Sequence, residues 1–346
     1  MSSFVGDSSF AEKQLLWITF SLLVFFIFSK IDWRFFKKGE VLATLFIFSA
    51  LLLGFLFLGN QVRGIKGWIS FGEVYFQPVE AMKIILILVL SKYFSRRHIE
   101  IANVKHILIS GVYALIPFIL VLLQPDFGSA VIIFLIWLGM VMVSGVSKKH
   151  LLAVFLLGIL SSVILWSFVF APYQKARIVS FLNPLSDIRG SGYSAFQSQI
   201  AIGSGQLFGR GVGYGTQSRL RFLPEHQTDF IFAAFAEEWG FVGVAMLFLF
   251  FGIIIYRILV NSIVAASNFE TLFGVGLAVL LMSQFAINVG MNVGLLPVTG
   301  LALPFMSYGG SHLLAEFAGL GILMGMRRYS RGIRKDDVGQ EYLGPI

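Results

Sequence analysis

The sequence has no cysteine and little charge, and both absences narrow its chemistry. Without cysteine there are no disulfides, thiolate nucleophiles or cysteine metal sites. Charged residues make up 13% of the chain, whereas soluble proteins carry about 25%. Hydrophobic residues reach 57%, including 37 phenylalanines. This composition argues against a single soluble core and favours a membrane protein.

Signatures of several other functions are also missing. The five histidines show no zinc-like spacing such as His-Glu-x-x-His. The glycine-rich stretch 203–215 lacks the Gly-Lys-Ser/Thr ending of a phosphate loop and any strand–helix context for a dinucleotide fingerprint. The net charge of +8 would suggest nucleic acid in a soluble protein, but in a membrane protein it reflects loops that face anionic lipid.

Nine apolar segments are long enough to cross a membrane, for which about 20 residues are needed. The sequence therefore predicts an all-α polytopic membrane protein, with residues 1–346 forming one multi-pass domain. The break Gln124-Pro125-Asp126 separates the fourth span from the fifth. The expected spans are 13–29, 41–59, 77–94, 107–123, 129–145, 150–170, 230–256, 270–292 and 309–326.

The orientation follows from lysine and arginine in the short loops, which accumulate on the cytoplasmic side. One face has only Arg63 and Lys66 in its short loops, so it lies outside. The polar stretch 171–228 is then a large extracytoplasmic loop, and loops of this length are usually functional. Nine spans with a cytoplasmic C-terminus place the N-terminus outside, and we expect that a first span is missing from this chain. The other face carries Lys30, Arg34, Lys37, Lys38, Lys92, Arg96, Arg97, Lys105, Lys148, Lys149, Arg257 and the basic C-terminal tail.

Two charged residues begin the third span. Pro78 suits the first turn of a helix, and Glu80 then lies near the positive end of the helix dipole. Lys83 lies on the same face as Glu80 at i, i+3 and can pair with it. The alternative is a helix-start carboxylate with a lysine whose side chain reaches back to the interface.

Two aspartates precede apolar spans. Asp126 lies in a turn before Phe127-Gly128-Ser129, where it can cap the fifth span. Asp229 directly precedes the run beginning at Phe230, where a capping role competes with a functional carboxylate at the membrane boundary.

Further polar residues lie in or beside the last spans. Glu237 and Glu238 are adjacent and cannot both face lipid, so at least one should face the interior, or the helix should bend near Gly240. Four more residues frame the outer end of the eighth span, where they can line a cavity or join neighbouring helices: Asn288, Asn292, Thr299 and Ser307. The long loop adds basic residues that can grip an anionic ligand or simply make a flexible basic loop: Lys175, Arg177, Arg210, Arg219 and Arg221.

Six segments together resemble the SEDS family, the shape, elongation, division and sporulation proteins of bacteria. They occur in the family's order and cover most of the chain, and TQSRLRFLPE (216–225) resembles the rod-shape branch more than the division branch. The segments are GWISFGEVYFQPVEAMKI (67–84), QPDFGSA (124–130), YQKARIVSFLNP (173–184), IAIGSGQLFGRG (200–211), RFLPEHQTDFIFAAFAEEWGFVG (221–243) and NVGLLPVTGLALPFMSYGGS (292–311).

This resemblance implies a ten-span protein that polymerises lipid II into glycan strands at the outer side of the bacterial cytoplasmic membrane. Asp229 matches the family's essential loop aspartate, Glu80 and Lys83 its third-span polar pair, and Asp126 its Gln-Pro-Asp aspartate. It also implies a class B penicillin-binding protein, a transpeptidase, as partner, together with other elongation-complex membrane proteins. Gly67 stands where many members carry arginine, so Lys66 or Arg63 is expected to substitute in binding substrate phosphate.

The implied reaction assigns a general-base role to Asp229, because a sugar hydroxyl is a poor nucleophile. Lys83, Arg177 and Arg210 are candidates to neutralise the departing pyrophosphate. No cofactor is assigned, although a divalent cation such as Mg²⁺ is compatible with this chemistry. A lipid II flippase and a non-catalytic scaffold are the alternatives, since intramembrane charge is also typical of transporters.

Overall fold

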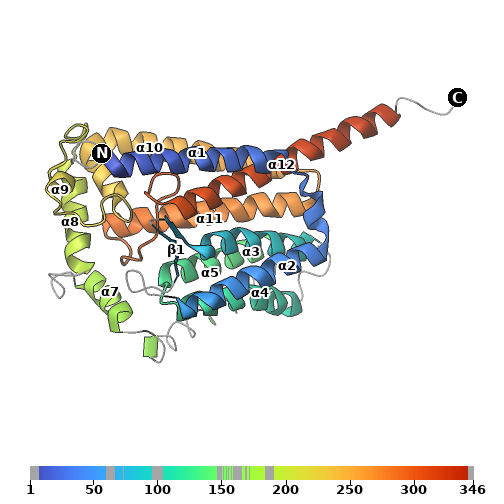
Figure 1. Cartoon of the computed structure of the whole chain (residues 1–346), viewed down its shortest axis with the longest axis horizontal. Helices are drawn as coiled ribbons and strands as arrows, with labels where there is room; N and C mark the ends of the chain where they lie inside the picture. Colours follow the sequence, from blue (N-terminus) through green and yellow to red (C-terminus); the bar gives the residue numbers. More distant parts are fainter. Residues whose placement is uncertain are drawn as a thin grey trace.

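The computed structural model describes residues 8–59, 67–72, 74–95, 104–145, 172–183 and 191–341, and scattered positions between 150 and 170. Across these residues the protein is an all-α polytopic membrane protein (Figure 1). Its long helices are α1 (Ser8–Lys30), α2 (Gly39–Phe55), α3 (Pro78–Ser95), α4 (Val104–Leu123), α5 (Phe127–Val143), α10 (Ile231–Ile263), α11 (Asn268–Val293) and α12 (Gly310–Glu341). Short 3-10 turns follow α1 and α2 at η2 (Trp33–Lys37) and η3 (Leu56–Leu58).

Each long helix coincides with one expected span, so helices occupy eight of the nine segments that the hydropathy pattern marks. Within the described residues, α1, α2, α4, α10 and α11 are long and apolar enough to cross a membrane, and α5 is a shorter apolar helix. Helix α3 is less apolar because it carries Glu80, Lys83 and Lys92. The remaining expected span, 150–170, lies mostly outside the described residues.

Helix α11 lies at the centre of the bundle and α1 at its edge. The apolar window of α11 is 61% buried, whereas that of α1 is 6% buried. Helix α11 packs against α3, α5, α10 and the shorter helix α8 (Ser191–Ser204). Side chains near the C-terminal end of α11 are therefore surrounded by several elements, and these side chains hold the candidate site.

The segments between the long helices contain regular structure of their own. The loop 171–228 forms α7 (Pro172–Leu182), α8 and the one-turn α9 (Thr216–Arg219). An antiparallel pair, β1 (Ile69–Phe71) and β2 (Val74–Phe76), precedes α3 and departs from the all-helical expectation. Its aromatic and β-branched residues favour a strand pair, and Gly72 adopts the positive φ of 65° that the tight turn requires.

The two ends of the bundle differ. Helices α7, α8 and α9 gather at one end together with the start of α1, and the C-terminal part of α12 extends from the opposite end (Figure 1). This arrangement agrees with the expected topology, in which the N-terminus and the 171–228 loop share one side of the membrane.

Candidate active site

Asp229 lies in the turn that precedes α10, one residue before the N-cap position of that helix. The N-cap residue of α10 is Phe230, with no side-chain capping hydrogen bond. Asp229 is half-buried, and its carboxylate faces Gly300, where an added Cβ would lie 3.4 Å from Asp229 Oδ2. The Asp229 carboxylate is therefore positioned at the Gly300 segment, and its role stays a prediction.

Two asparagines of α11 hold the main chain of Asp229. Asn288 Nδ2 donates to the Asp229 carbonyl oxygen at 3.0 Å, and Asn292 Nδ2 donates to the same oxygen at 3.1 Å. Both asparagines are fully buried. Asn292 Oδ1 also accepts from the Ala233 amide at 3.2 Å. The asparagines thus join α11 to the Asp229 turn and the start of α10.

The segment between α11 and α12 holds the same turn from the other side. Ser307 Oγ donates to the Thr228 carbonyl at 2.7 Å, and the Tyr308 amide donates to the Gln227 carbonyl at 2.8 Å. Ser307 Oγ also accepts from the Leu303 amide at 2.7 Å. Residues 227–229 are therefore hydrogen-bonded along their main chain from two independent elements, which fixes where the Asp229 side chain begins.

Glu80 and Lys83 form a buried ion pair, as their spacing predicts. Lys83 Nζ lies 2.7 Å from Glu80 Oε1, and the two side chains are 0% and 9% exposed. His312 and Glu316 of α12 are also buried and lie within electrostatic range of the pair. Four ionisable residues from two helices therefore share the interior between α3 and α12.

Asp126 has the capping role that its sequence context predicts, and it also joins two helices. Its Oδ1 accepts from the Ser129 amide at 3.0 Å at the start of α5. Its Oδ2 accepts from Gln77 Nε2 at 3.1 Å, immediately before α3. The main-chain amide of Gln77 donates to Ser311 Oγ at 2.9 Å. Asp126 is therefore part of a hydrogen-bonded connection between α5, α3 and α12.

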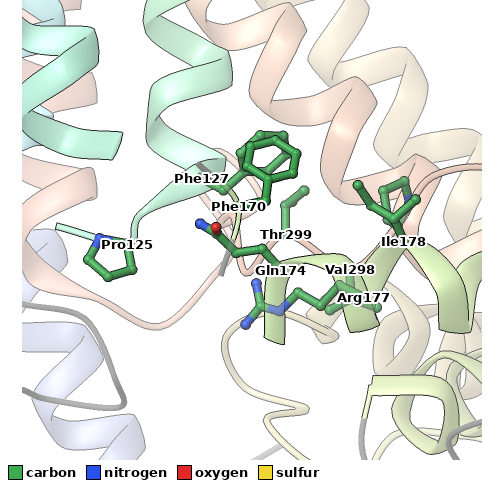
Figure 2. Close-up of a pocket in the computed structure, with 9 residues that line it drawn as sticks. Pro125, Phe127, Phe170, Gln174, Arg177, Ile178, Val298 and Thr299 are labelled. Carbon is green, nitrogen blue, oxygen red and sulfur yellow. The ribbon is translucent and has the colours of Figure 1, made fainter. Parts of the chain in front are cut away.

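A small cleft lies between α7, the start of α5 and the 297–299 segment. Gln174 and Arg177 extend into it from α7 (Figure 2). Its volume is about 20 Å³, which is room for roughly one water molecule. Its lining residues are Pro125, Phe127, Phe170, Gln174, Arg177, Ile178, Pro297, Val298 and Thr299. Thr299 shares this cleft with Arg177, and the next residue, Gly300, faces the Asp229 carboxylate.

The glycine-rich stretch packs against a break in α10 rather than forming a phosphate loop. Gly240 has φ 64° and ψ −166° inside α10, so the expected bend is confirmed. A Cβ on Gly209 or on Gly240 would collide with backbone atoms of the facing segment. We call residues 205–211 and 236–242 together the glycine clasp. Four main-chain hydrogen bonds of 2.9–3.0 Å hold it together. The amide donates to the carbonyl in each pair: Phe241 to Gln206, Val242 to Leu207, Arg210 to Glu237 and Gly211 to Glu238.

Glu237 and Glu238 are both buried, whereas the sequence required this of at least one of them. Glu237 also belongs to the glycine clasp. Glu237 Oε1 accepts from the Gln217 amide at 3.0 Å and from Thr216 Oγ1 at 3.1 Å, while Oε2 contacts Ser218. Glu237 therefore anchors α9 on α10. Arg210 is part of the glycine clasp, and its Nε donates a hydrogen bond to the Ser204 carbonyl at 3.2 Å.

Lys66, another expected substrate-binding cation, lies outside the described residues.

Sequence reasoning missed Glu316 and His312 as neighbours of the Glu80–Lys83 pair. Both fall within the expected span 309–326, where an ionisable residue already indicates a functional or structural role. Among the described residues, no group of three or more His, Cys, Asp or Glu side chains is placed to hold a metal ion.

Comparison with known proteins gives a consistent result along the chain. The profile of the FtsW/RodA/SpoVE family, described as cell cycle proteins, matches residues 2–332. A probable peptidoglycan glycosyltransferase FtsW from Haemophilus influenzae is 35% identical over 94% of this chain and 82% of its own. Stage V sporulation protein E from Bacillus subtilis is 35% identical over 93% of this chain and 88% of its own. The peptidoglycan glycosyltransferase MrdB from Escherichia coli is 35% identical over 95% of this chain and 88% of its own.

Solved structures show the same similarity in three dimensions. A chain of a peptidoglycan synthase complex, studied for the coordination of polymerization and crosslinking, superposes with a TM-score of 0.81 at 32% identity, covering 95% of this chain and 92% of that one. The rod shape determining protein RodA of Thermus thermophilus superposes with a TM-score of 0.70 at 29% identity, covering 95% and 91%.

Proposed function

This chain belongs to the FtsW/RodA/SpoVE family of cell cycle proteins, and from that premise we propose that it polymerises lipid II with Asp229 as general base. The protein is a peptidoglycan glycosyltransferase, as the relatives that match it over more than 90% of its length are named. The observation that carries the proposal is the fixation of the Asp229 main chain by Asn288 and Asn292 at 3.0 and 3.1 Å.

In the proposed reaction, the 4-hydroxyl of an acceptor GlcNAc attacks the anomeric carbon of the growing strand's MurNAc. The new carbon–oxygen bond forms as the bond to undecaprenyl pyrophosphate breaks, and the hydroxyl proton passes to Asp229. A positioned base contributes about 10²–10⁴-fold to such a step. A single displacement inverts the anomeric carbon without a covalent sugar–enzyme intermediate.

Arg177 is the best-placed candidate to meet the pyrophosphate. It is half-buried in the cleft beside Thr299, one residue from the glycine that faces Asp229. Lys83 is fully buried and paired with Glu80 in this conformation, so we assign that pair to shaping the interior beneath the substrate. Asp126 supports the same region through Gln77. Arg210 lies on the glycine clasp and remains a candidate for more distant parts of the strand.

A divalent cation such as Mg²⁺ would enter with the substrate in this proposal. Mg²⁺ is commonly held by one or two carboxylates together with substrate phosphates. The half-buried Asp229 carboxylate and the pyrophosphate offer such oxygens, and no step of the proposed mechanism depends on the ion.

The proposed partner is a class B penicillin-binding protein, and the proposed location is the bacterial cytoplasmic membrane with the 171–228 loop outside. A structural relative comes from a complex that joins polymerization and crosslinking. Helix α10 offers apolar surface for a partner's membrane helix, since Phe241, Leu249 and Phe250 are 65%, 61% and 62% exposed. The FtsW, stage V sporulation protein E and MrdB relatives are all 35% identical to this chain, so the elongation role is part of the proposal.

A flippase is the competing function because intramembrane ion pairs such as Glu80–Lys83 also occur in transporters. Detergent separates the two functions, since it removes the two leaflets between which a flippase moves lipid. The purified protein with its transpeptidase should convert labelled lipid II into glycan in detergent. Flipping in vesicles without any glycan in detergent would overturn the proposal.

A further inference from the structure

Helix α12 contains a buried carboxylate that the proposed reaction does not use. Glu316 is 2% exposed, and a carboxylate buried in a span is unfavourable unless it has a partner. Its Oε2 accepts a hydrogen bond from the Phe305 amide at 3.0 Å. The partner is thus main chain of the segment that joins α11 to α12.

Phe305 needs this support because its backbone conformation is unfavourable. Its φ is 63°, the left-handed region that non-glycine residues rarely adopt. The Phe305 ring also meets the ring of Phe317 edge-on, with centroids 5.8 Å apart. Both the main chain and the side chain of Phe305 are therefore tied to one turn of α12.

Phe305 belongs to a tight turn that reaches the candidate base. The amides of Met306 and Ser307 donate to the Leu303 carbonyl at 3.2 and 3.1 Å. Ser307 Oγ then donates to the Thr228 carbonyl at 2.7 Å, one residue before Asp229. Glu316 is thus connected to the Asp229 turn by its hydrogen bond to Phe305, the short covalent segment from Phe305 to Ser307, and the hydrogen bond from Ser307 to Thr228.

We propose that Glu316 is a positioning residue for Asp229, acting as the hydrogen-bond acceptor that sets the 303–308 turn. The proposal rests on the proposed role of Asp229. The alternative is an electrostatic role, because Glu316 also lies within electrostatic range of Glu80 and Lys83. In that case its charge, rather than its acceptor oxygen, would matter.

Two conservative variants separate these roles. Glu316→Gln removes the charge and keeps an acceptor oxygen at the same distance, whereas Glu316→Asp keeps the charge and withdraws the oxygen by one methylene. Lipid II polymerisation is measured over a range of substrate concentrations, normalised to folded protein. The positioning role predicts kcat within about threefold of wild type for Glu316→Gln. It predicts a fall of about 10–100-fold in kcat for Glu316→Asp, with little change in KM.

A matched control and a second site make the result specific. Glu270 is another buried carboxylate, 6% exposed near the opposite end of α11, and Glu270→Asp should leave kcat near wild type. If Glu316 acts through Ser307, then Glu316→Asp combined with Ser307→Ala should lower kcat by less than the product of the two single effects. Fully multiplicative effects would show independent routes and overturn the proposal.

The remaining outcomes are equally decisive. Loss of activity in Glu316→Gln with retention in Glu316→Asp would assign the role to charge, and retention or loss in both would also overturn the positioning role. Asp229→Asn in the same assay tests the proposed function separately. An active Asp229→Asn variant would overturn the base assignment. If Asp229→Asn is inactive but Glu316→Asp is fully active, only the positioning role of Glu316 is overturned.

Discussion

Asn292 donates its side-chain amide to the main-chain carbonyl of Asp229 at 3.1 Å. The same side chain accepts from the Ala233 amide and from Ser198 Oγ, so one residue of the central helix joins the Asp229 turn, α10 and α8. The catalytic geometry proposed here is therefore set by the interior of the bundle. The outer loops alone do not determine it.

Removing either asparagine should misplace Asp229 without removing it. We expect Asn288→Ala and Asn292→Ala to lower kcat by about 10–100-fold with little change in KM, because an ångström-scale shift of a catalytic group has effects of that size. Asn292→Ala should be the more damaging variant, since it also leaves Ala233 unpaired. Gln284→Ala removes a buried amide one turn earlier in α11 and serves as control. Equal activity in all three variants would contradict the positioning role.

The Glu80–Lys83 pair should behave as one unit in stability measurements. Breaking a buried ion pair from one side costs about 3–5 kcal/mol, whereas replacing both partners by neutral residues is often nearly neutral. We therefore expect Lys83→Met and Glu80→Gln each to destabilise the protein more than the double variant does. Unfolding in mixed detergent measures this directly, and strictly additive losses would argue that the 2.7 Å contact contributes nothing.

The glycine clasp should tolerate no side chain at its centre. Gly209→Ala and Gly240→Ala each place a Cβ against facing backbone atoms at a positive φ, so we expect a loss of more than about 2 kcal/mol or failure to fold. Gly252→Ala, in the same helix α10, meets nothing within 4 Å. That control should be neutral or stabilising by up to about 1 kcal/mol. Comparable melting temperatures for Gly240→Ala and Gly252→Ala would contradict the packing described here.

His226 should make the fold sensitive to acid. Burial lowers the pKa of His226 below its ordinary 6.5, with Arg221 acting in the same direction and hydrogen bonding to Leu223 opposing it. The unfolded chain therefore binds the proton first, and stability contributed at neutral pH is lost as the pH falls below about 6.5. His226→Gln should reduce the drop in melting temperature between about pH 7.5 and pH 5.5. An unchanged drop would show that other groups cause it.

The sequence was most informative where chemistry is local. The spans follow from apolar length, the Glu80–Lys83 contact from i, i+3 spacing, and the Asp126 cap from its turn. Sequence could not show that Asn288 and Asn292 meet Asp229, because 59 and 63 residues separate them and their partner is a main-chain oxygen. Nor could it show that the 205–211 glycines face α10, since close backbone approach leaves no side-chain pattern. Glu316 was detectable as a charge in an apolar span.

The most direct test of the central claim is glycan synthesis by Asp229→Asn. The variant keeps the size of the side chain and the main-chain bonds to Asn288 and Asn292, and removes the proton acceptor. Purified protein with the proposed transpeptidase partner is given labelled lipid II, and the glycan is resolved on a gel. Glu225→Gln, in the same turn, is the matched control.

The general-base role predicts that Asp229→Asn folds and binds the proposed transpeptidase, yet polymerises at least about 100-fold more slowly. Glu225→Gln should make full-length strands. Full-length glycan from Asp229→Asn at the wild-type rate would contradict that role.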